Sequence, residues 1–361
     1  MVTLLGWLVF ILSIIAIVRL IKIYELASEM RGGKPQWEVT ESDNRFNARM
    51  MIVFGVAFFA FCFWLFFAYK DKLLPISASE HGTHIDWLFN FNMAIIGVVF
   101  VAANAVLFFF AYKYFGSKKN NKATFFTESH KLELIWTVIP GVVLVVIIFL
   151  GIKTWNNITA PAQGESMVME LYAKQFDWTA RYAGKDNKLG RRNFRLITDT
   201  NPMGLDLTDP DGKDDIVVHN EFHIPKGKQI DFKLGSRDVI HSAYMPHFRA
   251  QMNCVPGMTT MFHFVPTVST DEMRKRPEVI KNMTEVNELL AKKGEPPVEF
   301  NYLLLCNKIC GLSHYNMQMN IIVDEPAQFN EWISKQKTVG ETISASTENK
   351  TDNDKMLAEK K

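Results

Sequence analysis

Residues 306–317 have the sequence Cys-Asn-Lys-Ile-Cys-Gly-Leu-Ser-His-Tyr-Asn-Met, which places two thiols, an imidazole and a thioether in one short stretch. Sulfur and imidazole are soft and borderline ligands, a set that favours copper over hard cations. Apolar runs of β type at 299–305 and 317–323 flank the stretch, so it is predicted to be a loop between two strands. Such a loop can turn all four side chains towards one point. The stretch therefore predicts a metal site carried by a β domain.

Three simpler sites would use only part of this residue set. A disulfide between Cys306 and Cys310 leaves His314 and Met317 without a role. A structural zinc site has no need of methionine, and a single-copper blue site takes only one cysteine. Two cysteines that both bridge a pair of metals, each metal holding one histidine, use the whole set. His241, in the sequence Ser-Arg-Asp-Val-Ile-His-Ser at 236–242, is the candidate for the second histidine.

The β domain is predicted to cover residues 156–337. Short apolar runs closed by turn residues or charges are typical of an all-β sandwich or barrel, and they lie at 167–172, 215–219, 229–234, 259–265, 299–305 and 317–323. Two insertions are expected, a long polar loop near 181–214 and a charged segment with helix-forming composition near 268–298. The tail at 338–361 has almost nothing to bury and is predicted to be disordered.

The first half of the chain contains four apolar segments long enough, or nearly so, to span a bilayer as helices, at 1–18, 50–69, 87–112 and 134–152. The first could be a signal peptide, but no basic residue precedes it and no clear cleavage site follows. A retained helix is therefore expected. We predict an additional helix pair at 1–70 and a helical hairpin at 85–155, which makes the chain a multi-domain membrane protein.

The distribution of basic residues predicts the orientation of these helices. Cytoplasmic loops carry an excess of Lys and Arg. Basic residues are concentrated in the first and third loops, at Arg19, Lys22, Arg31, Lys34, Arg45 and Arg49 and at Lys113, Lys118, Lys119, Lys122 and Lys131. The second loop has only Lys70 and Lys72. Both termini and the β domain are thus predicted to face outward. The net charge of +2, with dispersed lysines, indicates no nucleic-acid role.

The pattern C-x-x-x-C-G-x-x-H-x-x-M, preceded by S-R-D-V-I-H-S, closely resembles the binuclear copper A site of cytochrome c oxidase subunit II. Further segments similar to that family are Ile-Pro-Lys-Gly-Lys at 224–228, Met-Pro at 245–246, Val-Pro-Gly-Met at 255–258 and Glu-Leu-Ile-Trp-Thr-Val-Ile-Pro at 133–140. The resemblance covers roughly residues 85–333. It implies a cupredoxin-like domain after a two-helix hairpin, so residues 1–70 would be an addition.

The resemblance also implies the ligands of two coppers, namely His241, Cys306, Cys310, His314, Met317 and the main-chain carbonyl of Lys308. The family usually has glutamate where this chain has Lys308, and that carboxylate helps to bind magnesium at the contact with subunit I. An ammonium group cannot coordinate Mg²⁺, so no magnesium ligand is expected from this chain. Haem is expected only in the partner subunit.

Three further residues have candidate roles in electron or proton transfer. Phe176 stands where the family usually has the tryptophan that accepts electrons, and Trp178 is a second candidate, although aromatic residues at strand spacing are most often core. The change leaves open whether the donor is a soluble c-type cytochrome or a tethered c-type haem domain. Glu133 matches the mouth of a proton pathway into subunit I, whereas an arbitrary glutamate there could simply reach water.

The function implied is that of the electron-accepting subunit of a cytochrome c oxidase in a bacterial plasma membrane. Electrons from a c-type cytochrome would pass through copper A to haem in subunit I, where oxygen is reduced to water and protons are translocated. Further respiratory-complex subunits and lipid are expected neighbours. Quinol oxidase subunits lack the copper ligands, nitrous oxide reductase is soluble, and a copper chaperone would not need His314 and Met317. A nitric oxide reductase with a copper A subunit remains an alternative.

Overall fold

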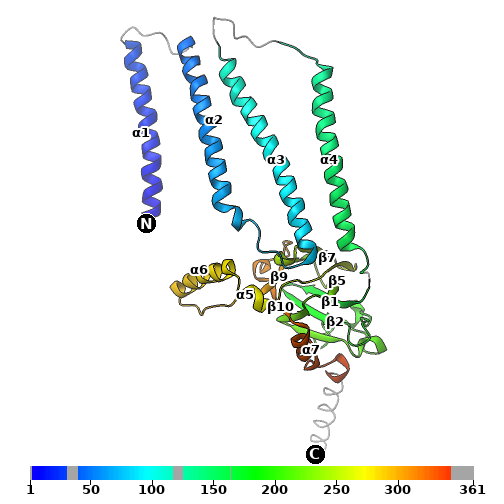
Figure 1. The fold of residues 1–361 in the computed structure, drawn as a ribbon. Helices are drawn as coiled ribbons and strands as arrows, with labels where there is room; N and C mark the ends of the chain where they lie inside the picture. The colour runs from blue at the N-terminus through cyan, green and yellow to red at the C-terminus, as the bar shows by residue number, and fades with distance from the viewer. Residues whose placement is uncertain (1, 31–39, 117–124, 163, 343–361) are drawn as a thin grey trace, which may run out of the picture. The chain divides into compact units, whose positions relative to one another are not determined.

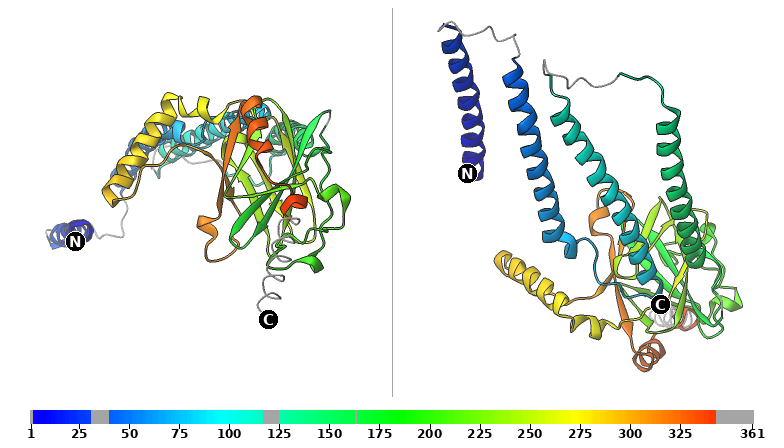
Figure 2. Two further views of the ribbon diagram at one scale, coloured as in Figure 1. Left: turned by 90° about the horizontal axis from the view of Figure 1, so that it is seen from below. Right: turned by 45° about the horizontal axis from the view of Figure 1, so that its top comes forward.

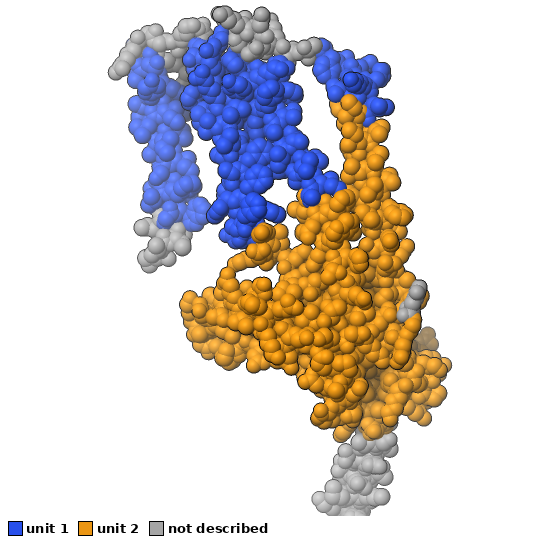
Figure 3. Space-filling view, viewed as in Figure 1, with its two compact units in different colours: residues 1–69, 94–134 blue, residues 70–93, 135–361 orange. Residues whose placement is uncertain are grey.

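A computed structural model describes residues 2–30, 40–116, 125–162 and 164–342. The chain divides into two compact units (Figure 3). The first comprises residues 1–69 and 94–134, and the second comprises residues 70–93 and 135–361. Most of the predicted disordered tail, residues 343–361, lies outside the described residues.

Four long helices make up the N-terminal half of the chain (Figure 1). They are α1 (Val2–Met30), α2 (Glu41–Tyr69), α3 (Glu80–Lys113) and α4 (His130–Thr159). Each is long and apolar enough to cross a membrane, which confirms the prediction of four spans. The helix α4 continues through Pro140, as transmembrane helices often do when other groups satisfy the freed backbone carbonyl.

Within the first unit, aromatic side chains join α2 to the second half of α3. Phe108 of α3 lies against Gly55 of α2, where an added Cβ atom would be 2.8 Å from the ring. Phe54, Phe58 and Phe59 of α2 surround the same ring with centroid distances of 5.9, 6.2 and 6.2 Å. A glycine therefore allows close approach, and part of the aromatic density of α2 serves helix packing rather than lipid contact alone.

The second unit contains two five-stranded mixed sheets. The first sheet has the order β3-β2-β1-β5-β8, formed by β1 (Ser166–Lys174), β2 (Asp177–Tyr182), β3 (Ile216–His219), β5 (Gln229–Ser236) and β8 (Thr260–Phe264). The second has the order β4-β10-β9-β6-β7, formed by β4 (Glu221–Pro225), β6 (His241–Met245), β7 (Ala250–Cys254), β9 (Tyr302–Cys306) and β10 (Gln318–Asp324). The pairs β1–β5 and β4–β10 are parallel, and the other named pairs are antiparallel.

Alternation along the strands builds the core between the sheets. In β10, Met319, Ile321 and Val323 are buried while the residues between them are less so, as expected when successive side chains point to opposite faces. Large side chains that are fully buried fill the interior, among them Trp178, Tyr302, Phe222, Phe232, Phe262 and Phe264. This arrangement confirms the predicted all-β, cupredoxin-like domain.

Four strands, β2, β4, β6 and β7, were not among the predicted apolar runs. They carry polar residues or proline, as in His-Ser-Ala-Tyr-Met of β6. In β4 and β7 buried residues are mixed with more exposed ones, whereas β2 and β6 are buried along most of their length. Tertiary burial rather than local apolar content makes these segments strands.

The segments predicted as insertions have defined structure. The polar loop contains two single-turn helices, η2 (Phe194–Leu196) and η3 (Pro210–Gly212), and the charged segment contains α5 (Thr270–Arg274) and α6 (Pro277–Lys293). Figure 2 shows α6 extending away from the strands. The predicted disordered tail began too early, because Val339 and Gly340 donate main-chain hydrogen bonds to the carbonyls of Asp215 and Lys213. These bonds follow α7 (Pro326–Ser334).

Candidate metal centre

Strand order in the second sheet brings the candidate ligands together. The strands β9 and β10 are antiparallel neighbours, and the loop 307–317 joins them. The strand β6 pairs with the other edge of β9, with Ala243 opposite Cys306. Since β6 begins at His241, this register carries that histidine to the start of the loop, 65 residues away in sequence.

The six predicted ligands form one cluster. The two sulfur atoms of Cys306 and Cys310 are 3.8 Å apart, and both cysteines are free thiols. Each sulfur has its own imidazole, because His241 Nδ1 lies 3.8 Å from Cys306 Sγ and His314 Nδ1 lies 3.5 Å from Cys310 Sγ. The remaining two ligands complete the group, with Met317 Sδ 3.9 Å from Cys310 Sγ and Lys308 O 3.2 Å from Cys306 Sγ.

This donor set fits copper. Two thiols, two imidazole nitrogens and a thioether are soft or borderline ligands, unlike the all-oxygen sets of magnesium or calcium. Burial and the neighbouring Cys306 raise the pKa of the Cys310 thiol, and a bound cation would favour its thiolate form. The pairing of each sulfur with one imidazole suits two metals bridged by both sulfurs.

Asp238 holds the ring of His241 in place. The His241 side chain is fully buried, and its Nε2 lies 2.8 Å from Asp238 Oδ1, which leaves Nδ1 directed at Cys306. Burial opposes ionisation of Asp238, but hydrogen bonds from the Gln175 amide, the His241 ring and the Val239 amide outweigh it and lower the pKa of the carboxyl group. A carboxylate that fixes the second nitrogen of a ligating histidine is a common support for a metal site.

Two aromatic residues adjoin the cluster in different ways. Phe176 is half-buried, and its ring lies over the loop, since a Cβ added to Gly311 would be 2.7 Å from Phe176 Cζ. The preceding Gln175 donates from Nε2 to the carbonyl of Cys310 at 2.5 Å. Trp178 is fully buried, with its ring centroid 6.3 Å from that of His241. Trp178 therefore cannot touch an external donor itself.

Sequence reasoning missed Asp238 and Gln175 as parts of the site. The signal for Asp238 was its place three residues before a candidate ligand histidine, in Asp-Val-Ile-His.

Glu133 lies in the first turn of α4, in the first unit, with its carboxylate 3.4 Å from His130 Nδ1 and its side chain 48% exposed. Cys254 is buried in β7 opposite His241, and burial raises the pKa of its thiol to about 12, which suits an inert packing role.

Comparison with known proteins gives the family of this chain. A family profile described as "Cytochrome C oxidase subunit II, transmembrane domain" matches residues 68–153. The chain is 34% identical to the alternative cytochrome c oxidase subunit 2 of Bradyrhizobium diazoefficiens, over 71% of this chain and 81% of that protein. The chain belongs to the cytochrome c oxidase subunit II family. It is also 25% identical to the cytochrome c oxidase subunit 2 of Thermostichus vulcanus, over 77% and 82% of the two chains.

Two solved structures are similar to parts of this subunit II chain. One is the periplasmic domain of subunit II of cytochrome oxidase of Bradyrhizobium japonicum, with a TM-score of 0.29, 19% identity and coverage of 48% of this chain and 95% of that one. The other is from a heme-copper terminal oxidase dimer, with a TM-score of 0.31, 16% identity and coverage of 55% and 100%. The matched family segment, 68–153, contains α3 and most of α4, and α1 and nearly all of α2 lie outside it.

Proposed function

We propose that this subunit II binds two copper ions as a copper A centre and relays electrons from a c-type haem donor to haem in subunit I. Oxygen would be reduced to water there, coupled to proton translocation. The observation that carries the proposal is the pairing of each cysteine sulfur with its own imidazole, at 3.8 and 3.5 Å. When bound, the copper pair would accept and release one electron that both metals share.

The residues of this chain supply a site for that chemistry in which His241, Cys310 and Met317 are buried. His241, Cys306, Cys310, His314 and Met317 would be the side-chain ligands, and Lys308 would contribute its main-chain carbonyl. His241 begins β6, Cys306 ends β9 and Met317 immediately precedes β10, so the positions of these three ligands are tied to the register of one sheet. Little rearrangement on electron transfer is expected from ligands held in this way, because packed strands define a site more precisely than a free loop does.

Phe176 is the proposed contact through which electrons arrive. Its ring packs on Gly311, the neighbour of Cys310, and it is partly accessible. Trp178 would act only as an interior aromatic group beside His241. The donor would be a c-type cytochrome or a tethered c-type haem domain. Replacing Phe176 with Ala is expected to slow electron transfer from the reduced donor, with an unchanged copper spectrum, whereas Phe176→Trp should preserve it.

The magnesium ligand of the family is proposed to be absent from this chain. Lys308 has its carbonyl at the copper cluster, and an ammonium side chain cannot coordinate a cation. A manganese ion added as a probe for magnesium should therefore show no ligand from this chain in its magnetic resonance spectrum.

The membrane orientation and the proton route are also proposals. The basic loops predict a bacterial plasma membrane protein with the copper domain and both termini on the outer side. Glu133, near the cytoplasmic end of α4, would lie at the mouth of a proton pathway in subunit I. Reporter fusions after the second and third helices would test the orientation, because an active outer-side reporter should appear only after the second.

Copper loading of the full chain in detergent tests the central proposal. Two coppers per chain and a mixed-valence paramagnetic signal spread over both nuclei are expected. Cys310→Ser should abolish that signal, while Cys62→Ser, a thiol change in α2, should leave it intact. One copper per chain, or none, would contradict the proposal. Oxygen consumption rather than nitric oxide consumption by the assembled complex would then separate an oxidase from a nitric oxide reductase.

A further inference from the structure

A cavity of about 700 Å³ lies on the outer side of the first sheet, beneath the polar loop at 183–215. Strand alternation explains which side chains reach it. In β1 the residues Met169, Leu171 and Ala173 fill the core, so Glu170 and Tyr172 point the other way, into the space under the loop. We call this space the loop cavity. Its volume lies within the range of small-molecule sites, roughly 300–1,000 Å³.

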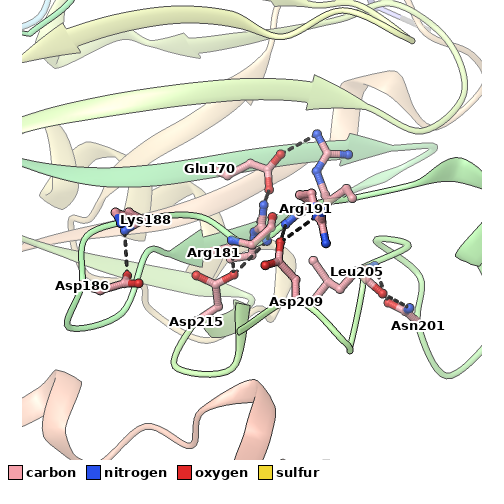
Figure 4. A network of polar contacts seen from close by, with 11 residues as sticks. Glu170, Arg181, Asp186, Lys188, Arg191, Asn201, Leu205, Asp209 and Asp215 are labelled. Atoms are coloured by element: carbon pink, nitrogen blue, oxygen red, sulfur yellow. Dashed lines mark hydrogen bonds and ion pairs between the residues drawn. The ribbon is translucent and has the colours of Figure 1, made fainter. Parts of the chain in front are cut away.

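The floor of the loop cavity is a buried network of ion pairs (Figure 4). Glu170 accepts from both Arg181 and Arg192, and the Arg181 guanidinium also donates to Asp215 Oδ2 at 2.9 Å. Arg181, Glu170 and Asp215 are almost completely buried. The two guanidinium groups and the two carboxylates neutralise each other. The floor is therefore rigid and carries no net charge.

Further basic residues line the walls of the cavity, and the ion pairs of the floor do not neutralise them. Besides Arg181 and Arg192, the lining includes Lys233 and Arg237, and Glu170 is its single carboxylate. Lys233 Nζ lies 3.0 Å from Asp231, whereas Arg237 has no carboxylate within ion-pairing distance in the described part of the chain. Arg237 is an exposed residue. The cavity therefore keeps a net positive charge and an arginine fork free to bind an oxyanion.

The same cavity also has apolar groups, which would contact the uncharged part of an anionic ligand. Phe194 and Met258 line it and are 76% and 59% exposed. The Arg192 guanidinium lies 4.4 Å from the centre of the Tyr172 ring. Gly235 allows this arrangement, because an added Cβ would be 2.7 Å from Arg192 Nη2. The lining of the cavity thus combines cationic groups with aromatic and apolar ones.

We propose that the loop cavity binds a small amphiphilic oxyanion, a molecule with a phosphate or carboxylate group and an aromatic or apolar body. Arg237 would bind the anionic group, and Phe194 and Met258 would cover the body. A protein partner would need a broad surface of about 800 Å², whereas this site is a concave space partly covered by the loop. The proposal does not depend on copper, and it goes beyond the electron-transfer role.

Titration of the full chain in detergent with phenyl phosphate tests the proposal. Saturable binding of one phenyl phosphate per chain is expected, with weaker binding of inorganic phosphate and none of benzyl alcohol. Arg237→Gln should weaken phenyl phosphate binding by roughly tenfold or more, because a charge-assisted hydrogen bond is lost. Phe194→Ala should weaken phenyl phosphate but not inorganic phosphate.

A matched arginine distinguishes a built site from general attraction to positive charge. Arg276, an exposed residue that precedes α6, lies outside the cavity lining, so Arg276→Gln should leave binding unchanged. Equal weakening by Arg276→Gln and Arg237→Gln would overturn the proposal, as would failure of the wild-type chain to bind phenyl phosphate. Copper content measured on the same samples keeps this result separate from the copper proposal.

Discussion

The orientation of the His241 ring depends on a single carboxylate. Asp238 accepts from both His241 Nε2 and the Gln175 amide, at 2.8 and 2.7 Å, so it links the histidine to the loop that carries Phe176. An amide in its place could accept only one of these bonds. Asp238 therefore positions a proposed ligand and would not itself touch the metal.

Asp238→Asn is therefore expected to lower copper affinity by about 10- to 100-fold, the usual cost of losing such a support. Competition for copper against a chelator would measure the change. Asp271→Asn, at an aspartate whose side chain is 62% exposed and which pairs only within its helix, is the control. An Asp238 variant that holds copper as tightly as the wild type would show that packing alone orients the ring.

Asp215 makes stability depend on pH. Burial raises the pKa of its carboxyl group to about 6, against the opposing effects of the Arg181 guanidinium and the Gly190 amide, with Asp214 and Glu170 adding to the rise. The ordinary value is 3.8, so the folded state binds a proton more tightly than the unfolded state does. The stabilisation of the folded state by protonated Asp215 is therefore complete below pH 3.8 and is lost as the pH rises through about 6.

The free energy of unfolding of the wild type, relative to Asp215→Asn, should thus fall by up to about 3 kcal/mol between these limits. Unfolding of the full chain in detergent at a series of pH values would measure the difference. A difference that stays constant from pH 4 to pH 7 would contradict the raised pKa of Asp215. A difference that rises over this range would indicate a lowered pKa instead.

Among the elements, α5 is only five residues long and depends on its N-terminal cap. Ser269 Oγ accepts from the Glu272 amide at 3.3 Å, and the Glu272 carboxylate accepts from the Ser269 amide at 2.9 Å, which is a complete capping box. Thr270, the next residue, accepts a buried hydrogen bond from the main chain of Val323 in β10. The cap therefore also fixes where the helical insertion leaves the sheet.

Ser269→Ala should lower the free energy of unfolding by about 1 kcal/mol, because one orphan amide of the helix loses its partner. Denaturant unfolding followed by aromatic fluorescence would measure it. Thr284→Ala in the middle of α6 is a suitable comparison, since its hydroxyl only donates back to the carbonyl of Ile280 and alanine favours helix. A loss at Thr284 as large as that at Ser269 would argue against the capping explanation.

At the scale of the whole molecule, Arg249 joins the start of α3 to the β sandwich within the second unit. Its side chain is 7% exposed and donates to both carboxylate oxygens of Asp86, at 2.7 and 3.0 Å. It also donates to the carbonyls of Pro75 and Pro246. The Ser79 hydroxyl adds a hydrogen bond of 2.6 Å to the carbonyl of Phe248. These bonds tie a membrane-type helix directly to the β sandwich.

Asp86→Asn should destabilise the full chain by about 1–3 kcal/mol, less than for a fully buried pair because Asp86 is 28% exposed. The midpoint of thermal loss of the copper spectrum, in detergent, would report the change. Asp71→Asn, at an exposed aspartate beyond α2, should leave the midpoint unaltered. Equal midpoints for the wild type and both variants would mean that the ion pair of Arg249 and Asp86 does not hold the start of α3 to the β sandwich.

Local patterns determined much of this protein. Uninterrupted apolar segments predicted four spanning helices, because a bilayer requires that length and composition in any tertiary context. Four of the six candidate ligands were recognisable because their side chains lie in one loop of twelve positions, 306–317. The Lys308 carbonyl and His241 were assigned because the sequence resembles a known family. The charged residues near 181–214 predicted a solvated insertion, but Arg181 at its start is a buried strand residue.

Only the tertiary structure decided the contacts between distant segments. The register of β6 on β9 sets His241 beside Cys306, and the turn before β2 lays Phe176 over Gly311. The buried network of Glu170, Arg181 and Asp215 and the cavity above it have the same origin. Strand pairing can shift in steps that the sequence of one strand does not reveal, so side chains that meet across a sheet are known only once both partners are in place.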